Sequence, residues 1–134
     1  MTTFRFKNAA RFSVFCVVGC SRPIPTAANC PKLDLGYELQ QYRVPEPQAL
    51  PHCLTEQAVK LSPAGGASNE IASAAVTACG SYLGLYESFA AIERFRQGDL
   101  NAQEDAQPQV QKAAERYALS RVVQVRAGEC SKRR

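Results

Sequence analysis

The sequence predicts a small all-α domain that disulfides hold together and that a proline-rich arm precedes. From residue 51 onward, apolar residues recur every three or four positions, which is the spacing of amphipathic helices. Six of the eight prolines lie in residues 21–51, and proline disfavours helix interiors. Four cysteines lie beyond residue 29, an even number that suits two disulfides. We therefore expect a helical hairpin and a C-terminal helix in residues 51–134.

The proline-rich arm, residues 20–50, is interpreted as an irregular tether that lifts the folded part away from its anchor. Residues 33–44 are the one stretch of the arm that is a candidate for a short helix or strand. Their apolar alternation is poor, so the sequence leaves the choice open.

The first helix is expected from Pro51 to Leu61. Leu54 and Ala58 precede Leu61 at helical spacing, and proline is favoured in a first turn because its missing N–H has no helical partner there. The run Ser-Pro-Ala-Gly-Gly at residues 62–66 ends the helix and makes the turn of the hairpin.

The second helix is expected as one element from Ser68 or Asn69 to Arg96. Serine and asparagine are good N-caps, and Glu70 in the first turn interacts favourably with the helix dipole. The apolar stripe of this helix consists of Ile71, Ala74, Ala75, Ala78, Tyr82, Leu85, Phe89 and Ile92. A G-x-x-x-G motif at residues 80–84 weakens its middle and is expected to allow close packing or a bend.

The third helix is expected to begin at Pro108, after a polar connection over residues 100–107. It is expected to end near Gly128, where glycine favours termination. Its apolar side consists of Val110, Ala113, Ala114, Tyr117, Val122 and Val125.

The spacing of the cysteines around the turn favours one of the three pairings that four cysteines allow. Cys53 lies 13 residues before residue 66, and Cys79 lies 13 residues after it. Because both helices of an antiparallel hairpin rise about 1.5 Å per residue, positions equidistant from the turn lie level across the interface. We therefore expect the disulfide Cys53–Cys79. The remaining pair, Cys30–Cys130, would attach the arm to the C-terminal end.

The first twenty residues have the pattern of an export signal. Arg5, Lys7 and Arg11 make the start positive, and residues 12–19 are uncharged and mostly apolar. Eight residues are too few to span a bilayer, which needs about 20. The run ends in Val-Val-Gly-Cys at residues 17–20, which resembles the lipobox of bacterial lipoproteins.

The lipoprotein resemblance implies where the protein is held. In that class the residues before the cysteine are removed and the cysteine receives acyl chains such as palmitate. Residues 1–19 would then be the signal peptide, and Cys20 the lipidation site and membrane anchor. Ser21 stands where enteric lipoproteins of the inner membrane carry Asp, which implies an outer-membrane lipoprotein facing the periplasm. The alternatives are a soluble periplasmic protein cleaved after Ala28 and a cytosolic thiol protein.

The charge balance excludes a general affinity for nucleic acid. The net charge is +4, but three of the 16 basic residues lie in the expected signal peptide. The remaining chain is close to neutral, and its only basic cluster is the C-terminal Lys-Arg-Arg at residues 132–134. Such a tail is typically solvated; its functional interpretation is contact with anionic envelope lipids or polymers.

The sequence has no recognisable catalytic or metal-binding pattern. The only histidine, His52, is adjacent to Cys53, and neighbouring helical residues point about 100° apart, so the two do not form a catalytic pair. None of the four cysteines beyond residue 29 has C-x-x-C spacing. We therefore expect no enzyme activity, no cofactor, no metal and no small-molecule substrate.

Aromatic residues on the second predicted helix are the candidate surface for an envelope protein partner. Tyr82 and Tyr86 lie one turn apart, and Arg94 and Arg96 follow near the helix end. We define these four residues as the candidate partner patch. The same aromatic spacing is typical of a core, so this interpretation requires that part of the set is exposed.

The helical part resembles small uncharacterised exported proteins of Gram-negative bacteria. The resemblance is carried by the runs NEIASAAVTAC at residues 69–79 and RVVQVRAG at residues 121–128. It brings no known activity with it. We expect a binding or structural role in the cell envelope. The alternative is a phage- or plasmid-encoded lipoprotein, such as a spanin-like lysis subunit or an exclusion factor, and gene neighbourhood would separate the two.

Overall fold

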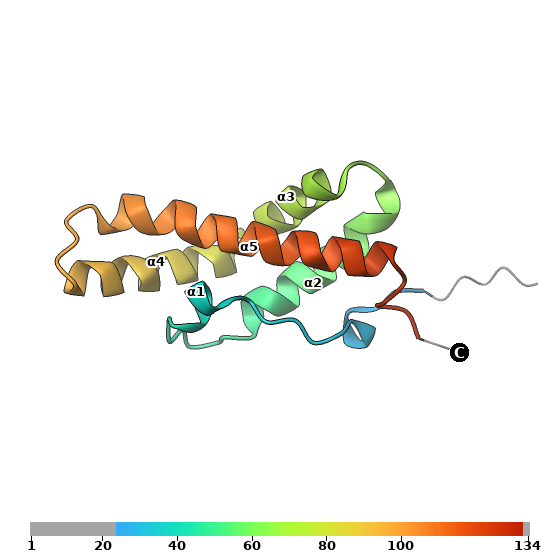
Figure 1. The fold of residues 1–134 in the computed structure, drawn as a ribbon, viewed down its shortest axis with the longest axis horizontal. Helices are drawn as coiled ribbons and strands as arrows, with labels where there is room; N and C mark the ends of the chain where they lie inside the picture. Colours follow the sequence, from blue (N-terminus) through green and yellow to red (C-terminus); the bar gives the residue numbers. More distant parts are fainter. Residues whose placement is uncertain (1–23, 133–134) are drawn as a thin grey trace, which may run out of the picture.

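Helices dominate the computed structural model, which describes residues 24–132, and the described chain contains no strand (Figure 1). Five α-helices follow in order: α1 (Tyr37–Gln40), α2 (Ala49–Leu61), α3 (Ser68–Ala78), α4 (Gly80–Arg96) and α5 (Ala102–Arg126). Two short 3-10 turns accompany them, Ala27–Asn29 and Ser62–Ala64. The predicted all-α class is therefore confirmed, although the predicted three helices become five.

Helix α5 is the longest helix of the described chain and contacts α2, α3 and α4 along its length (Figure 1). Its buried face is rich in alanine, and small side chains allow neighbouring helices to approach closely. The buried residues of this face extend from Ala102 to Val125, and Val110 and Val122 are its largest fully buried apolar side chains. Helix α4 runs antiparallel to the first half of α5, while α2 and α3 cover its second half (Figure 1).

The α2–α3 hairpin forms as the sequence predicts. Gly65 and Gly66 adopt φ values of 78° and 95°, a region that favours glycine, and they reverse the chain after Ser62–Ala64. Cys53 and Cys79 lie level across the two helices and form a disulfide with Cα atoms 6.0 Å apart. The prediction of this pair from equal residue counts on either side of the turn is therefore confirmed.

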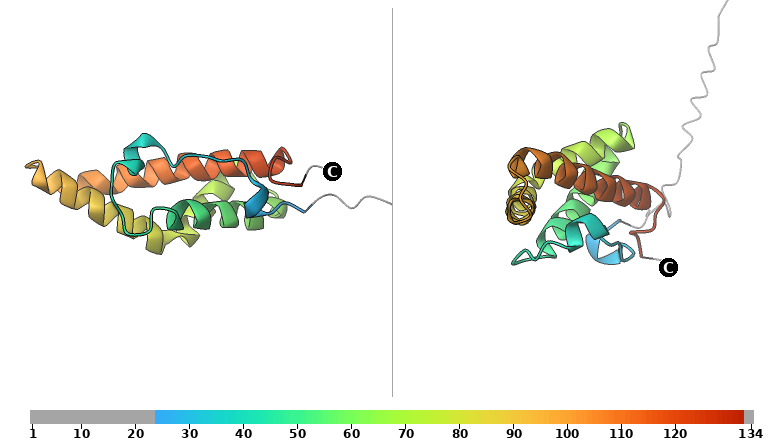
Figure 2. Two further views of the ribbon diagram at one scale, coloured as in Figure 1. Left: turned by 90° about the horizontal axis from the view of Figure 1, so that it is seen from below. Right: turned by 60° about the vertical axis from the view of Figure 1, so that its left-hand side comes forward.

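The expected single helix from residue 68 to Arg96 is wrong, because the chain bends at Cys79. That residue has φ −98° and ψ 20°, and its N–H is shared between the carbonyls of Ala75 and Val76 at 3.1 Å each. Its side chain is buried and bonded to α2. The bend lets α3 pack beside α2 while α4 turns away to follow α5 (Figure 2).

The G-x-x-x-G motif coincides with the bend but makes no close helix contact. A Cβ atom added at Gly80 or Gly84 would meet nothing within 4 Å. Of the two expected roles, close packing is therefore wrong for this motif. Gly80 is instead the first residue of α4, directly after the bend.

The third predicted helix begins six residues earlier than expected, at Ala102 rather than Pro108. Ala102, Ala106 and Val110 lie four residues apart and are buried, so the segment that reads as a polar connection has one apolar edge. Pro108 is exposed inside α5, where it removes one backbone hydrogen bond without ending the helix.

The described part of the proline-rich arm lies against the helices. Leu35, Leu39, Tyr42 and Val44 are buried in the common core, and the segment runs along α5 (Figure 2). The disulfide Cys30–Cys130 confirms the second predicted pair and attaches the arm to the C-terminal end. This packing shows that residues 30–48 are not a free tether. The apolar residues of the arm are spaced too irregularly for the sequence to predict it.

Candidate functional site

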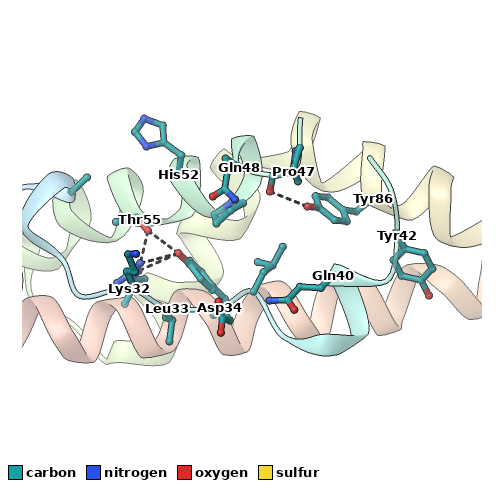
Figure 3. Close-up of a pocket in the computed structure, with 15 residues that line it drawn as sticks. Lys32, Leu33, Asp34, Gln40, Tyr42, Pro47, Gln48, His52, Thr55 and Tyr86 are labelled. Atoms are coloured by element: carbon teal, nitrogen blue, oxygen red, sulfur yellow. Dashed lines mark hydrogen bonds between the residues drawn. The ribbon is translucent and has the colours of Figure 1, made fainter. Parts of the chain in front are cut away.

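A cavity of about 690 Å³ lies between the arm, α2 and α5 (Figure 3). Its size falls within the range that small-molecule sites occupy in proteins. The arm supplies one wall because its residues 31–47 are packed across the gap between the two helices. The lining residues that matter below are Lys32, Asp34, Thr55, Tyr86, Tyr117 and Arg121.

A buried polar cluster forms the floor of this cavity. Thr55 comes from α2, whereas Tyr117 and Arg121 lie one turn apart on α5. The Arg121 Nε donates to Thr55 Oγ1 at 3.0 Å and to the Tyr117 hydroxyl at 3.2 Å. The two hydroxyl oxygens lie 3.1 Å apart and share a further hydrogen bond. All three side chains are more than nine-tenths buried.

Arg121 carries a buried positive charge whose contacts are all with neutral groups. Its Nη1 donates to the Pro31 carbonyl and to Gln124 Oε1, and its Nη2 donates to the Tyr117 hydroxyl at 3.1 Å. The guanidinium carbon also lies 5.3 Å from the centre of the Tyr117 ring. No Asp or Glu of residues 24–132 is within ion-pair distance of it. A buried charge without a counter-ion is costly, so this cluster is the most unusual electrostatic feature of the described chain.

The opposite end of the cavity is closed by Tyr86 of α4. Its hydroxyl donates to the Pro47 carbonyl at 3.1 Å, so the side chain fastens the arm to α4 (Figure 3). Burial raises the pKa of the Tyr86 phenol above its ordinary value, because the phenolate would lose its hydration.

The structure does not bring the candidate partner patch together. Tyr86 is 3% exposed and belongs to the core, so it cannot be the centre of a surface. Tyr82 is 42% exposed, and Arg96 is mostly solvated. Arg94 is used inside the α4–α5 hairpin, where Nη2 donates to Gln109 Oε1 at 2.6 Å and Nη1 pairs with Asp99 at 3.4 Å.

His52 lies at the rim of the cavity, and its ring is directed away from Thr55 (Figure 3). Its Nε2 atom is 3.1 Å from Glu56 Oε1, and both side chains are largely exposed. The neighbouring Cys53 is in a disulfide, so the two side chains form no thiol–imidazole pair. The site offers binding groups rather than a nucleophile with its base.

Sequence reasoning missed Thr55, Tyr117 as a polar group, and Arg121. The signal that was present is the position of Arg121 on the apolar stripe of the third predicted helix, one turn after Tyr117 and directly before Val122. A charged residue on a buried stripe requires hydrogen-bond partners inside the fold. Their identity depends on α2 and the arm, which only the tertiary structure brings alongside.

Comparison with known proteins finds no matching family model, no similar curated protein and no similar solved structure. Among residues 24–132, no group of three or more His, Cys, Asp or Glu side chains is placed to hold a metal ion. Within the same range, every helix is too short or too polar to cross a bilayer. The expected lipidation site, Cys20, lies outside the described residues.

Proposed function

We propose that this protein is a non-catalytic lipoprotein of the bacterial cell envelope, with a binding or structural role in the periplasm. A lipid on Cys20 would hold it in the outer membrane. The observation that carries the proposal is the pairing of every cysteine in residues 24–132 into a disulfide. Disulfides persist in oxidising compartments such as the periplasm and are rare in the cytosol, which favours export over a cytosolic thiol protein.

The Cys30–Cys130 disulfide limits the distance between the lipid and the domain. Cys30 is held at the C-terminal end of α5, and the Thr26 N–H donates to the Cys130 carbonyl at 3.0 Å. Cys30 lies ten positions after Cys20, and ten extended residue steps reach at most about 35 Å. A lipidated chain would therefore carry its helical domain close to the bilayer surface.

Exposed apolar side chains support a protein contact at the tip of the α4–α5 hairpin. Ile92, Phe95 and Leu100 are 49%, 66% and 88% exposed, and they replace the candidate partner patch as the most apolar part of this region. The tip lies at the opposite end of α5 from the Cys30–Cys130 disulfide, so an anchored domain would present it away from its tether (Figure 1).

The proposal is tested by the intact mass of the protein from a bacterial membrane fraction, before and after reduction. We expect loss of residues 1–19, a mass gain equal to acyl chains, and a gain of four hydrogens on reduction. The matched control is Cys20→Ser, which should abolish the acyl mass and leave the disulfides intact.

Two outcomes would contradict the lipoprotein. A chain cleaved after Ala28 without acyl mass would be a soluble periplasmic protein. A chain that keeps residues 1–19 and free thiols would be a cytosolic one.

A further inference from the structure

We propose that the cavity between the arm, α2 and α5 binds a small organic monocarboxylate. Its carboxylate would lie against Arg121, Thr55 and Tyr117, and its apolar body would extend towards Tyr86. This inference concerns the cavity alone and does not depend on the lipid anchor. It departs from the sequence-based expectation that the protein has no small-molecule substrate.

A count of the hydrogen atoms in the polar cluster shows that donors are left over. A guanidinium has five N–H groups. Nε uses its single hydrogen on the two hydroxyl oxygens, and Nη1 uses both of its hydrogens on Pro31 and Gln124. Nη2 has one acceptor, the Tyr117 hydroxyl, so its second N–H has none within the described chain.

The two hydroxyl groups leave a second donor. Thr55 Oγ1 and the Tyr117 oxygen share one hydrogen over 3.1 Å, and both oxygens also accept from Arg121. Two hydroxyl groups carry two hydrogens, so one has no acceptor among residues 24–132. An N–H and an O–H therefore remain unused in a cluster whose three residues all line the cavity. A carboxylate, which only accepts hydrogen bonds, matches such a pair of donors.

The charge of the lining favours an anion with a single charge. Among the charged lining residues, Arg121 and Lys32 are positive and Asp34 is negative, which gives the lining a formal net charge of +1. A monocarboxylate neutralises this charge. A phosphate dianion would leave a net negative charge in the cavity and would be repelled more strongly by Asp34. The charge cost of burying Arg121 would be relieved in the complex.

The rest of the lining is partly apolar and partly polar, and its apolar side chains would contact the body of the ligand. Leu35, Pro47 and Pro51 supply apolar surface to the lining, while Gln40 and Gln48 supply amide groups. Small-molecule sites typically combine such walls with a few converging polar groups. Benzoate has this chemistry and is the probe that we choose.

The test is titration of the purified full chain with benzoate, followed by calorimetry and by NMR shifts of the cavity residues. We expect saturable binding to the wild type, with benzyl alcohol, acetate and inorganic phosphate each binding more weakly. Tyr117→Phe removes a hydroxyl from the cluster and should weaken benzoate binding about tenfold. Its fold is checked separately by circular dichroism, because Tyr117 is buried.

Two exposed positions test the charge argument without disturbing the core. Lys32 and Asp34 are both solvated, and both line the cavity. Lys32→Gln should weaken benzoate binding and Asp34→Asn should tighten it, each by about two- to fivefold at low salt. Arg96→Gln is the matched control, because Arg96 is an exposed arginine that does not line the cavity, and it should leave the affinity unchanged.

Several results would overturn the proposal. Equal binding of benzyl alcohol and benzoate would show an apolar cavity with no anion site. Tighter binding of phosphate would contradict the monocarboxylate assignment. Absence of saturable binding, or equal affinities of the Lys32, Asp34 and Arg96 variants, would leave Arg121 with a purely structural role in its hydrogen bonds to the arm, α2 and α5.

Discussion

At the scale of single residues, burial decides what Tyr86 and Arg121 do. Both belong to types that are common on protein surfaces, yet they are 3% and 6% exposed. Tyr86 uses its hydroxyl to hold the Pro47 carbonyl, while Arg121 holds the Pro31 carbonyl. Two polar side chains of the helices thus fasten two points of the arm, and both lie in the wall of the same cavity.

Tyr86 should make the protein sensitive to alkaline pH. Because burial raises its pKa, the folded state holds the phenolic proton more tightly than the unfolded state, whose pKa is about 10. The stability from the neutral phenol is therefore complete below about pH 10 and is lost as pH rises through the folded-state pKa. Urea unfolding between about pH 8 and 11 should show this loss, and Tyr86→Phe should reduce it.

The Tyr86→Phe variant has its own cost at neutral pH, where losing the hydrogen bond to Pro47 should lower the unfolding free energy by about 1 kcal/mol. Tyr37→Phe is the matched control, because Tyr37 is 82% exposed and its substitution should leave the alkaline loss of stability as it is in the wild type. An equal alkaline loss in wild type and Tyr86→Phe would assign the effect to other groups.

At the scale of the helices, long-range contacts override local signals at two points. The second predicted helix splits at Cys79 because a disulfide holds that residue to α2 while α4 follows α5. Helix α5 continues through Pro108 because buried Ala102 and Ala106 hold the turns before it. In both cases packing along α5 outweighs the local preference of one or two residues, as tertiary context commonly does.

Gly84 is a position where a substitution should stabilise the helix. It lies inside α4, and an added Cβ would meet nothing within 4 Å. Gly84→Ala should therefore raise the unfolding free energy by about 0.5–1 kcal/mol, because alanine loses less backbone entropy in a helix. Chemical denaturation of the full chain measures the change.

Gly98 provides the control for the glycine substitution. It lies in the α4–α5 turn with φ 93°, where an L side chain is strained. Gly98→Ala should lower the unfolding free energy by about 1–2 kcal/mol. A stabilising effect of Gly98→Ala, or a loss in Gly84→Ala, would contradict the backbone conformations described for these two residues.

At the scale of the whole molecule, two disulfides and the arm make one unit of the described chain. Cys53–Cys79 closes the α2–α3 hairpin, whereas Cys30–Cys130 joins the start of the arm to the end of α5. The arm then covers the space between α2 and α5 and closes the cavity. The cavity therefore exists only while the N- and C-terminal parts of the described chain are held together.

The two disulfides should contribute unequally because they close loops of different length. They span 26 and 100 residues. In the chain-entropy model, replacing Cys53 and Cys79 by alanine should cost about 3.5 kcal/mol, and replacing Cys30 and Cys130 about 4.7 kcal/mol. Denaturant unfolding of the two double variants measures the difference. The reverse order would indicate that apolar contacts of the arm, rather than covalent closure, hold it in place.

The sequence by itself determined the helical class, the α2–α3 turn and both cysteine pairs. The class, the turn and the Cys53–Cys79 pair follow from local spacing: one apolar residue every three or four positions, two glycines between two helices, and equal residue counts on either side of them. The Cys30–Cys130 pair was expected only as the pair that remained. Only the tertiary structure decided the bend at Cys79, the burial of Tyr86 and the cavity with its unpaired Arg121. The physical reason is that each of these depends on side chains from α2, α5 and the arm meeting in space, and no local pattern encodes such encounters.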